Sequence, residues 1–373
     1  MTTYQDAGVH LGLGDLASQI LYEAARKTWK NREGKIGEVL VPFDDFSGLR
    51  AIDVSSLPRG TLLNINFDGI GTKIEIAERM NKHDTIAHDL FAMVCDDAVI
   101  RGAEPVLLGS ILDVNSLQNK KEEYITKIHE LAKGYVEAAE LSGVAVINGE
   151  IAELGRRMGE LGAFRYNWGA SLLWFARQDR LIIGDKIKEG DLIIALKEDG
   201  FRSNGFSLLR EVLERFHGQD WYFETFQKTT FGKMALQPSR IYTKAVLDMT
   251  GGLQGKANVD LHGAVHITGG GIPSKLGRLL KKNKVGAILN DLFEPNPLML
   301  YMQEKADISD KEAYRTWNMG QGMLLIVRES EEVLSIANNH HIGRIIGRIS
   351  KKSGIQIKSK GFFERDKMLM FND

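Results

Sequence analysis

Short apolar runs alternate with helical patterns along most of the 373-residue chain, and this alternation limits the fold more than any other feature. Thr61–Phe67 alternates apolar and polar residues as a half-buried strand does, and Thr85–Arg101 follows with apolar residues at helical spacing. Val106–Val114 is a predicted strand and Lys120–Leu141 a long charged helix. The order predicts an α/β or α+β fold in which each domain is a mixed sheet packed with helices.

A fresh series of strands and helices begins after a boundary predicted near residue 178. The chain length also favours two domains, residues 1–178 and residues 179–373. Further helices are predicted over Leu16–Lys30, Asn204–Phe216, Pro238–Met249, Pro273–Leu280 and Glu329–Asn338. Further strands are predicted over Val144–Ile147, Trp168–Phe175, Asp191–Leu196, Val285–Leu289 and Met323–Val327. Asn31–Leu49 reads as a loop or irregular strands.

Composition excludes several classes of protein. Hydrophobic residues make up 43% of the chain and charged residues 26%, so we expect a buried core. The formal net charge is −1, without the basic excess usual in a nucleic-acid-binding domain. No secretory signal is visible, and no apolar run approaches the length of a transmembrane helix. The single cysteine, Cys95, cannot form an intrachain disulfide, which favours a reducing, cytoplasmic location.

Carboxylates in apolar surroundings are the most informative residues. At about 100° per residue, Asp89 and Asp96 lie about 20° apart around their predicted helix, and Asp97 lies about 80° from Asp89. Asp68 ends the Thr61–Phe67 strand, and Glu150 follows the next apolar strand, with Glu153 as a second candidate.

Buried carboxylates must be paired or bind a cation. Oxygen ligands from several elements suit Mg²⁺, which proteins usually hold together with nucleotide phosphates. The alternative is that these acids cap helices or pair with Lys73, Arg79 and Arg101. For the set as a whole we favour a magnesium site.

Glycine-rich segments mark candidate anion sites. Asp68-Gly69-Ile70-Gly71-Thr72-Lys73 combines flexible backbone with a cation that can contact phosphate, although it has neither Walker A nor dinucleotide-binding spacing. In Thr268-Gly269-Gly270-Gly271-Ile272-Pro273, three glycines lead into a predicted helix whose first N–H groups can bind an anion.

Three further positions have a structural and a functional interpretation. His266 is either a hydrogen-bonded core residue or a group for proton transfer. Ser203-Asn204-Gly205 either caps a helix or binds substrate phosphate. The glycines after Asn318 can be a bulge at the start of a strand.

Taken together, these segments resemble the phosphoribosylformylglycinamidine cyclo-ligase family, also called aminoimidazole ribonucleotide synthetase, along nearly the whole chain. The matching segments are Tyr4-Gln5-Asp6-Ala7-Gly8-Val9, Asp68–Lys73, His83–Ile86 with Asp89-Leu90, Asp97–Pro105, Ser203–Leu208, Pro238–Tyr242, His266–Gly271 and Tyr314–Gly320. Asp97–Pro105 is common to a wider superfamily that includes selenophosphate synthetase and thiamine-monophosphate kinase. The N-terminal segment, His266–Gly271 and Tyr314–Gly320 point to the cyclo-ligase.

The chain departs from the family's pattern in three places. The glycine-rich flap is reduced to Gly34–Glu38, and the G-G-E-T-A-E-M-P segment reads Asn148-Gly149-Glu150-Ile151-Ala152-Glu153-Leu154-Gly155. Arg202 stands where the family usually has histidine before Ser203-Asn204-Gly205. These differences indicate a divergent member or a paralogue.

The resemblance implies a two-domain fold, a homodimer joined through N-terminal sheets, and an active site between the domains. The implied reaction uses ATP and Mg²⁺ to convert formylglycinamidine ribonucleotide to aminoimidazole ribonucleotide, with release of ADP and phosphate, in purine biosynthesis. The N-terminal domain would bind ATP and dimerise, and the C-terminal domain would complete the substrate site. No nucleic acid or membrane partner is expected.

With this reaction in view, each candidate residue has an expected role. His266, Asp68 and Lys73 are the catalytic candidates. The nucleotide candidates are Gly69, Gly71, Thr72, Lys73, Asp89, Asp97, Gly149 and Glu150, and the metal candidates are Asp68, Asp96, Asp97 and Glu150. The substrate candidates are Ser203, Asn204, Gly205, Thr268, Gly269, Gly270, Gly271 and Asn318. Two alternatives stay open: another ATP-dependent phosphoryl-transfer enzyme of the superfamily, and a nucleotide-binding regulatory paralogue.

Overall fold

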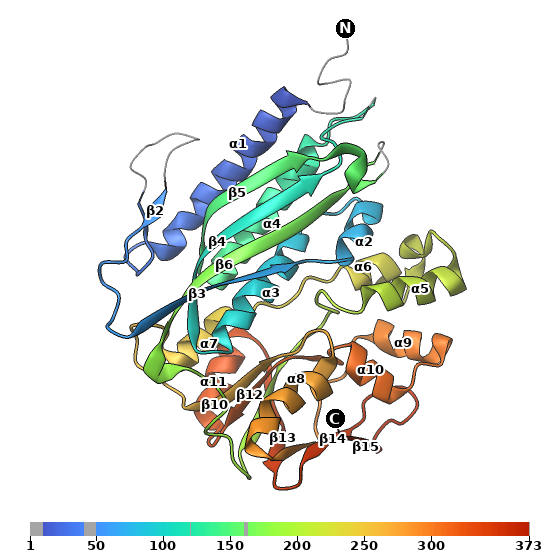
Figure 1. Ribbon diagram of the computed structural model, residues 1–373. Coiled ribbons are helices and arrows are strands. Elements are labelled where there is room, and N and C mark those ends of the chain that lie inside the picture. The colour runs from blue at the N-terminus through green and yellow to red at the C-terminus, as the bar shows by residue number, and fades with distance from the viewer. Residues whose placement is uncertain (1–9, 41–49, 120, 160–162, 373) are drawn as a thin grey trace. The chain divides into compact units, whose positions relative to one another are not determined.

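The computed structural model describes residues 10–40, 50–119, 121–159 and 163–372 (Figure 1). The predicted segment Tyr4–Val9, and residues 41–49 of the predicted loop, lie outside this part of the chain. The chain forms two compact units, the first comprising Met1–Ala98 and Glu104–Phe175, the second Val99–Ala103 and Ala176–Asp373. Each unit has a sheet packed with helices, which confirms the predicted fold class.

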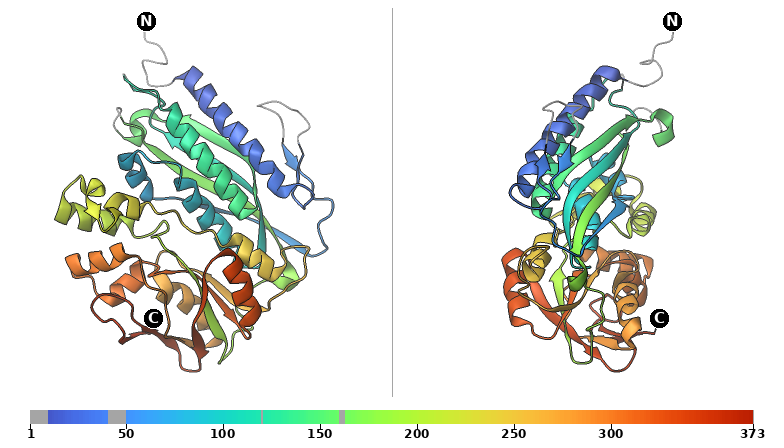
Figure 2. Two further views of the ribbon diagram at one scale, coloured as in Figure 1. Left: turned by 180° about the vertical axis from the view of Figure 1, so that it is seen from behind. Right: turned by 60° about the vertical axis from the view of Figure 1, so that its left-hand side comes forward.

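The first unit is built on a four-stranded sheet in the order β3-β6-β4-β5. The strands are β3 (Thr61–Gly69), β6 (Tyr166–Arg177), β4 (Ala103–Val114) and β5 (Ala145–Glu153), and the helices are α1 (Leu11–Thr28), α2 (Lys73–Met80), α3 (Ile86–Val99) and α4 (Ile125–Ser142). Helices α1, α3 and α4 lie on one face of the sheet, and the strands are seen uncovered from the other side (Figures 1 and 2). A short pair, β1 (Val39–Leu40) and β2 (Ala51–Ile52), is antiparallel.

The two edge strands of this sheet, β5 and β3, differ in how far they are covered by other residues. At β5, the Trp29 indole N–H donates to the Val146 carbonyl at 2.8 Å, and the Val146 N–H donates to the Thr28 hydroxyl at 2.8 Å. The last residue of α1 and the residue after it therefore satisfy backbone groups that an edge strand would otherwise expose. The other edge, β3, carries exposed apolar side chains: Leu63 is 60% exposed and Phe67 71%.

The second unit contains a seven-stranded sheet in the order β10-β12-β7-β13-β11-β14-β15. The strands are β10 (Leu261–His266), β12 (Gln321–Val327), β7 (Leu192–Lys197), β13 (Gly343–Ser350), β11 (Gly286–Leu289), β14 (Gly354–Lys358) and β15 (Met368–Phe371). The helices are α5 (Phe206–His217), α6 (Phe231–Ala235), α7 (Thr243–Thr250), α8 (Gly271–Leu280), α9 (Pro297–Ala306), α10 (Asp310–Thr316) and α11 (Glu331–His340), with a short pair β8 (Thr225–Phe226) and β9 (Thr229–Thr230).

The core of the second unit lies between its central strands and helices α7 and α11. Leu196, Val246 and Leu325 are fully buried there. Strands β10, β12, β7 and β13 are consecutive antiparallel neighbours, so their C-terminal ends alternate between the two opposite ends of the strands in the sheet. Strands β7 and β10 therefore end on the same side of the sheet, and the loops that follow them lead into α5 and α8.

Most predicted elements are present, although several differ in extent. The predicted helix Pro238–Met249 begins only at Thr243, because the backbone N–H and side chain of Arg240 are bound by acidic residues after β7. Helix α4 begins at Ile125 rather than Lys120, and β5 continues to Glu153. Glu150 therefore lies within a strand rather than after its end, where the sequence analysis placed it.

Candidate functional site

The Asp68–Lys73 segment forms the turn between β3 and α2. The Asp68 carboxylate accepts the Gly69 N–H at 2.7 Å, and the Ile70 N–H donates to the Trp168 carbonyl at 3.3 Å. Gly71 has φ 72°, a conformation that glycine adopts without strain. Thr72 then precedes α2 without capping it through its side chain.

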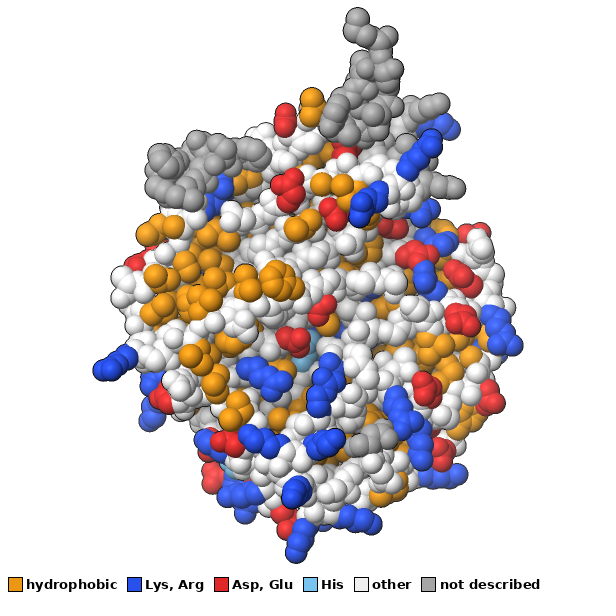
Figure 3. Space-filling model, viewed as in Figure 1, with side chains coloured by type: hydrophobic (Ala, Val, Ile, Leu, Met, Phe, Trp, Pro, Cys, Tyr) orange, Lys and Arg blue, Asp and Glu red, His pale blue; other side chains and the backbone are white. Residues whose placement is uncertain are grey.

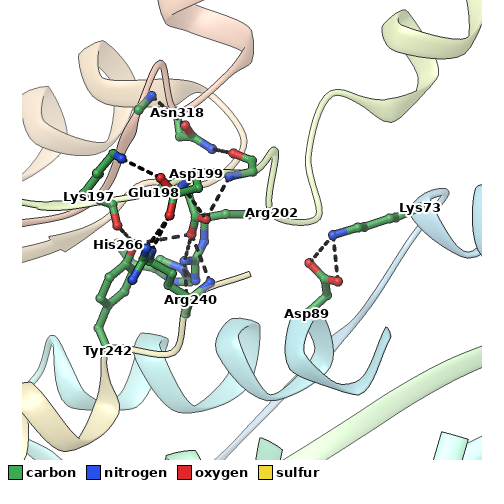
Figure 4. Close-up of polar contacts among 12 residues, drawn as sticks. Lys73, Asp89, Lys197, Glu198, Asp199, Arg202, Arg240, Tyr242, His266 and Asn318 are labelled. Carbon is green, nitrogen blue, oxygen red and sulfur yellow. Dashed lines mark hydrogen bonds and ion pairs between the residues drawn. The ribbon is translucent and has the colours of Figure 1, made fainter. Parts of the chain in front are cut away.

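Lys73 and Asp89 form an ion pair in which neither side chain is exposed (Figure 4). The Lys73 ammonium lies 2.8 Å from each Asp89 carboxylate oxygen. For Asp89, the structure thus shows the pairing with Lys73 that the sequence analysis gave as the alternative to a magnesium site. The predicted contacts of Lys73 with phosphate, and of Asp89 with nucleotide, stay predictions.

The adjacent acids Asp96 and Asp97 are separated by the turn of α3. Asp96 is fully buried, whereas Asp97 is exposed. The neighbouring Cys95 is also buried, and burial raises the pKa of its thiol, so this cysteine has no thiolate for nucleophilic chemistry. Asp97 is thus the member of the pair that an external cation can reach.

The other two metal candidates lie on opposite faces of the first sheet. Asn66 donates its side-chain N–H to the Val94 carbonyl of α3 at 3.0 Å, so alternation places Asp68 on the helix-covered face. Glu150 pairs with Ile111, which is 56% exposed on the other face. Because β3 and β5 are three strand positions apart, the two acids are separated by roughly 14 Å across the sheet.

The described residues of this chain contain no group of three or more His, Cys, Asp or Glu side chains able to hold a metal ion. The predicted magnesium carboxylates Asp68, Asp96, Asp97 and Glu150 are therefore not gathered within one chain. The second candidate, Glu153, accepts the backbone N–H groups of His10 and Leu117, each at 2.6 Å, so its carboxylate is used structurally.

The two glycine loops of the second unit meet at their helix N-termini. Gly205, with φ 80°, precedes α5, and Gly270, with φ 90°, precedes α8. The Asn204 amide lies against Gly269. At Gly271, with φ 58°, a Cβ would collide with the Tyr314 carbonyl. The N-termini of α5 and α8 thus lie together, and the positive ends of the two helix dipoles suit an anion.

Three buried polar atoms around these loops have no hydrogen-bond partner: Ser203 Oγ, Asn204 Oδ1 and Trp317 Nε1. The Trp317 indole packs against Gly205, and a Cβ there would collide with the ring. Leaving buried polar groups unpaired costs about 1–3 kcal/mol each, so their clustering favours a ligand at this place. Trp317 was not among the predicted site residues, because only its neighbour Asn318 was singled out.

Predicted substrate residues Thr268 and Asn318 are both nearly buried, at 7% and 4% exposure. The Asn318 amide donates to the Gly200 carbonyl at 2.9 Å and accepts the Gly320 N–H at 2.8 Å. Asn318 therefore connects the loop after β7 to the turn before β12, where a register shift confirms the predicted bulge.

Glu198, just after β7, organises this part of the second unit (Figure 4). One carboxylate oxygen accepts the N–H groups of Asp199 and Gly200, and the other contacts the Arg202 guanidinium at 2.8 Å. That second oxygen also accepts the Arg240 N–H at 3.2 Å and the Tyr242 hydroxyl at 3.3 Å. The sequence analysis missed Glu198, although it has the signal used for Asp68, an acid directly after an apolar strand.

His266 ends β10 and is 2% exposed. Its Nε2 atom lies 2.6 Å from the Arg202 guanidinium (Figure 4). The predicted catalytic histidine is therefore a hydrogen-bonded neighbour of the loop that carries Ser203–Gly205. Proton transfer by His266 stays a prediction.

Two family models match the chain. The N-terminal domain of "AIR synthase related protein" matches residues 51–166, and the C-terminal domain matches residues 188–360. Three relatives are phosphoribosylformylglycinamidine cyclo-ligases. The Pseudothermotoga lettingae protein is 33% identical over 88% of this chain and 90% of its own length. The Pyrococcus furiosus protein is 31% identical over 97% and 99%, and the Bacillus pumilus protein 34% identical over 94% and 96%.

Solved structures share the fold at low sequence identity. Thiamine-monophosphate kinase from Stenotrophomonas maltophilia has a TM-score of 0.60 at 14% identity, covering 93% of this chain and 97% of its own. Escherichia coli HypE has a TM-score of 0.62 at 12% identity, covering 95% and 96%. A hydrogenase maturation protein HypE in complex with ATP has a TM-score of 0.55 at 14% identity, covering 87% and 88%.

Proposed function

The chain belongs to the phosphoribosylformylglycinamidine cyclo-ligase family, and on this premise we propose that it closes the imidazole ring of aminoimidazole ribonucleotide in purine biosynthesis. It is an ATP-dependent ligase that forms a C–N bond. The observation that carries this assignment is 31–34% identity to cyclo-ligases over 88–97% of the chain, with matches to both domains of the family.

The proposed reaction joins two parts of one substrate, formylglycinamidine ribonucleotide. ATP transfers its γ-phosphoryl group to the formyl amide oxygen, and ADP leaves. A substrate nitrogen then attacks the activated carbon, and the C–O bond to phosphate breaks, which closes the ring. The protein must neutralise phosphate charge and hold the two reacting ends together.

The loops of the second unit supply the proposed substrate site. We assign the ribonucleotide phosphate to the N-termini of α5 and α8, at Ser203–Gly205 and Thr268–Gly271. The two helix N-termini, whose dipoles favour an anion, and the unpartnered Ser203 and Asn204 side-chain oxygens support this assignment. Asn318 would then act by holding the loop after β7 rather than by contacting substrate.

The nucleotide is assigned to the first unit, at Asp68, Gly69, Gly71, Thr72 and Lys73 at the end of β3. Contacts of the same nucleotide with Gly149 and Glu150 would require a second copy of the chain, because Glu150 lies on the opposite face of the sheet. Asp89 would act through Lys73, because the two side chains are paired. The ATP complex of a HypE with the same fold supports nucleotide binding.

Magnesium would accompany the nucleotide, held largely by phosphate oxygens and by one or two carboxylates. Asp97 is the favoured protein ligand because it is exposed, whereas Asp96 is buried. The four predicted carboxylates do not fit one magnesium site within a single chain, since Asp68 and Glu150 face opposite sides of the sheet.

A homodimer formed through β3 would explain the exposed edge of the first sheet. Leu63, Ile65 and Phe67 project from one face of β3 with exposures of 60%, 46% and 71%. Figure 3 shows hydrophobic side chains gathered over β3 and the strands beside it. A long apolar edge strand is unfavourable in water and is a typical place for pairing between chains.

We also propose that the protein works in the cytoplasm, as expected for a small-molecule enzyme with one buried thiol. Across the described part of the chain, no helix is both long and apolar enough to cross a bilayer.

The experiment that tests this function measures ADP release with ATP and a panel of small amide and phosphate substrates. Release that depends on formylglycinamidine ribonucleotide supports ring closure. Release with a different substrate would identify another phosphoryl-transfer enzyme, and ATP binding without release would identify a regulatory paralogue. Asp97→Asn should reduce Mg²⁺-dependent release at least ~100-fold while the protein stays folded; near-normal release removes Asp97 from the metal site.

A further inference from the structure

Arg202 joins the two loops of the proposed substrate site. It has φ 59°, in the left-handed region, directly before Ser203, and its side chain is fully buried. One guanidinium nitrogen contacts Glu198 at 2.8 Å and the Arg240 carbonyl at 2.9 Å, while the other lies 2.6 Å from His266 Nε2 (Figure 4). The backbone strain at Arg202 is therefore held by three side-chain contacts.

The Arg202 contact fixes the protonation of His266. A guanidinium has only N–H donors, so His266 Nε2 must accept with its lone pair. The imidazole is then neutral and carries its proton on Nδ1. A protonated His266 would place an N–H against the Arg202 N–H, which is repulsive.

The charged groups around this contact balance one another, so the direct contact with Arg202 decides the protonation of His266. Arg202 and Arg240 supply positive charge, offset by Glu198 and Asp199, and the Arg202 guanidinium lies over the Tyr242 ring at 5.2 Å. His341 also contacts the Tyr242 ring, and burial, with the charges of Arg240, His340 and Arg202, lowers the pKa of His341 to about 4.

We infer that Arg202 is a positioning residue: it ties the Ser203–Gly205 loop to His266 and keeps His266 a neutral imidazole with Nε2 engaged. His266 then acts by holding the loop before Thr268–Gly271, and Nε2 is not the atom that exchanges a proton with substrate. The catalytic part of this inference rests on the proposed ring-closing function, but the protonation state of His266 does not.

The site explains why arginine suits this position. A histidine before Ser203 has a shorter side chain and two ring nitrogens, so it cannot contact Glu198, the Arg240 carbonyl and His266 together. Arginine is planar and donates in several directions, which matches the three acceptors.

The direct test is nitrogen NMR of the full-length protein labelled with ¹⁵N-histidine, with the His266 signal assigned by its loss in His266→Gln. We expect His266 as the Nδ1–H tautomer, without titration between about pH 6 and 8. In Arg202→Lys, which keeps a cation beside Glu198, Nε2 should lose its donor, and the ring should titrate or change tautomer. An Nε2–H tautomer or an imidazolium in the unsubstituted protein overturns the inference.

Kinetics separate a positioning role from proton transfer. The glutamine amide introduced by His266→Gln can place an acceptor near the Nε2 position, whereas the leucine side chain introduced by His266→Leu cannot. We expect kcat/KM for His266→Gln to exceed that for His266→Leu by about 10-fold or more, and Arg202→Lys to raise KM for formylglycinamidine ribonucleotide about 10- to 100-fold. If both His266 variants lose kcat equally, by about 100-fold or more, His266 is a proton-transfer group and the inference fails.

The matched control is Arg348→Lys, at an exposed position on β13, which should leave both KM and the His266 signal unchanged. If no ring closure is found, the NMR result still decides whether Arg202 fixes His266. Failure of the proposed function is therefore distinguishable from failure of this inference.

Discussion

Replacing Lys73 by methionine should destabilise the first unit strongly, because it leaves the Asp89 carboxylate buried without its cation. Neither side chain is exposed, and the Lys73 ammonium contacts both Asp89 oxygens at 2.8 Å. Breaking a buried pair by removing one partner typically costs about 3–5 kcal/mol. Since total stability is commonly about 5–15 kcal/mol, Lys73→Met should remove a substantial part of it.

Removing both charges should cost much less than removing one. In Lys73→Met with Asp89→Leu, no unpaired charge stays buried, and apolar replacements of buried pairs are often close to neutral. The double-mutant cycle should therefore give a coupling energy of about 2–3 kcal/mol. Urea unfolding followed by circular dichroism, with hydrogen exchange of the α2 and α3 amides to locate the loss, measures it.

The matched control lies on the same helix. Arg79 pairs with Glu75 at 2.9 Å, but the side chains are 34% and 28% exposed, so Arg79→Met should cost less than about 0.5 kcal/mol. A cost below about 1 kcal/mol for Lys73→Met, with additive double-mutant effects, would refute the buried pair. Lys73 would then be available to phosphate, as the sequence analysis expected.

Three further predictions concern assembly, pH and the glycine loop. Phe67→Asp should convert the proposed dimer to monomers, measured by light scattering, because the substitution is present in both copies at the interface. The control Leu11→Asp, at a 69% exposed site on α1, should leave the molecular mass unchanged. An unchanged mass for Phe67→Asp refutes pairing through β3. Burial raises the pKa of Glu78 to about 7, so the cost of burying its charge is absent below about pH 4.5 and is fully present once pH rises through 7. Glu78→Gln should therefore raise the free energy of unfolding by about 3 kcal/mol at pH 8 and by little at pH 4. Equal changes in the free energy of unfolding at both pH values would contradict this. Gly271→Ala should destabilise by at least about 2 kcal/mol, because the Cβ meets the Tyr314 carbonyl at a positive φ, and a neutral unfolding midpoint would show that the loop relaxes.

Local periodicity predicted most of the secondary structure. Strand Thr61–Phe67 lies within β3, and helix Thr85–Arg101 corresponds to α3 at Ile86–Val99. Boundaries were missed where side chains far away in sequence hold the backbone. Pro238 does not open a helix, because Glu198 and Asp199 bind Arg240 in a non-helical segment.

The candidate site was predictable where a motif is local. The glycines of Gly269–Gly271 and the loop Ser203–Gly205 occupy the helix starts that the sequence indicated. The arrangement of the candidate carboxylates could not be predicted, because it depends on which face of a sheet each side chain occupies. Strand β5 extends past Glu150, and a bulge between Leu108 and Gly109 sets the face on which that acid lies.

Buried pairing also could not be read from the sequence. The apolar neighbours of Asp89 indicated burial, but not that Lys73 would neutralise it. Glu198 and Trp317 were not predicted as site residues, because a local sequence pattern does not show their contacts. Glu198 contacts Arg202, and Trp317 packs against Gly205 from another segment of the chain.

The measurement that tests the central claim most directly is detection of the product. The purified protein is incubated with formylglycinamidine ribonucleotide, ATP and Mg²⁺, and the diazotisable aromatic amine of aminoimidazole ribonucleotide is quantified beside ADP. We predict one amine formed for each ADP released. No amine, under conditions in which a known cyclo-ligase produces it, would contradict the assignment.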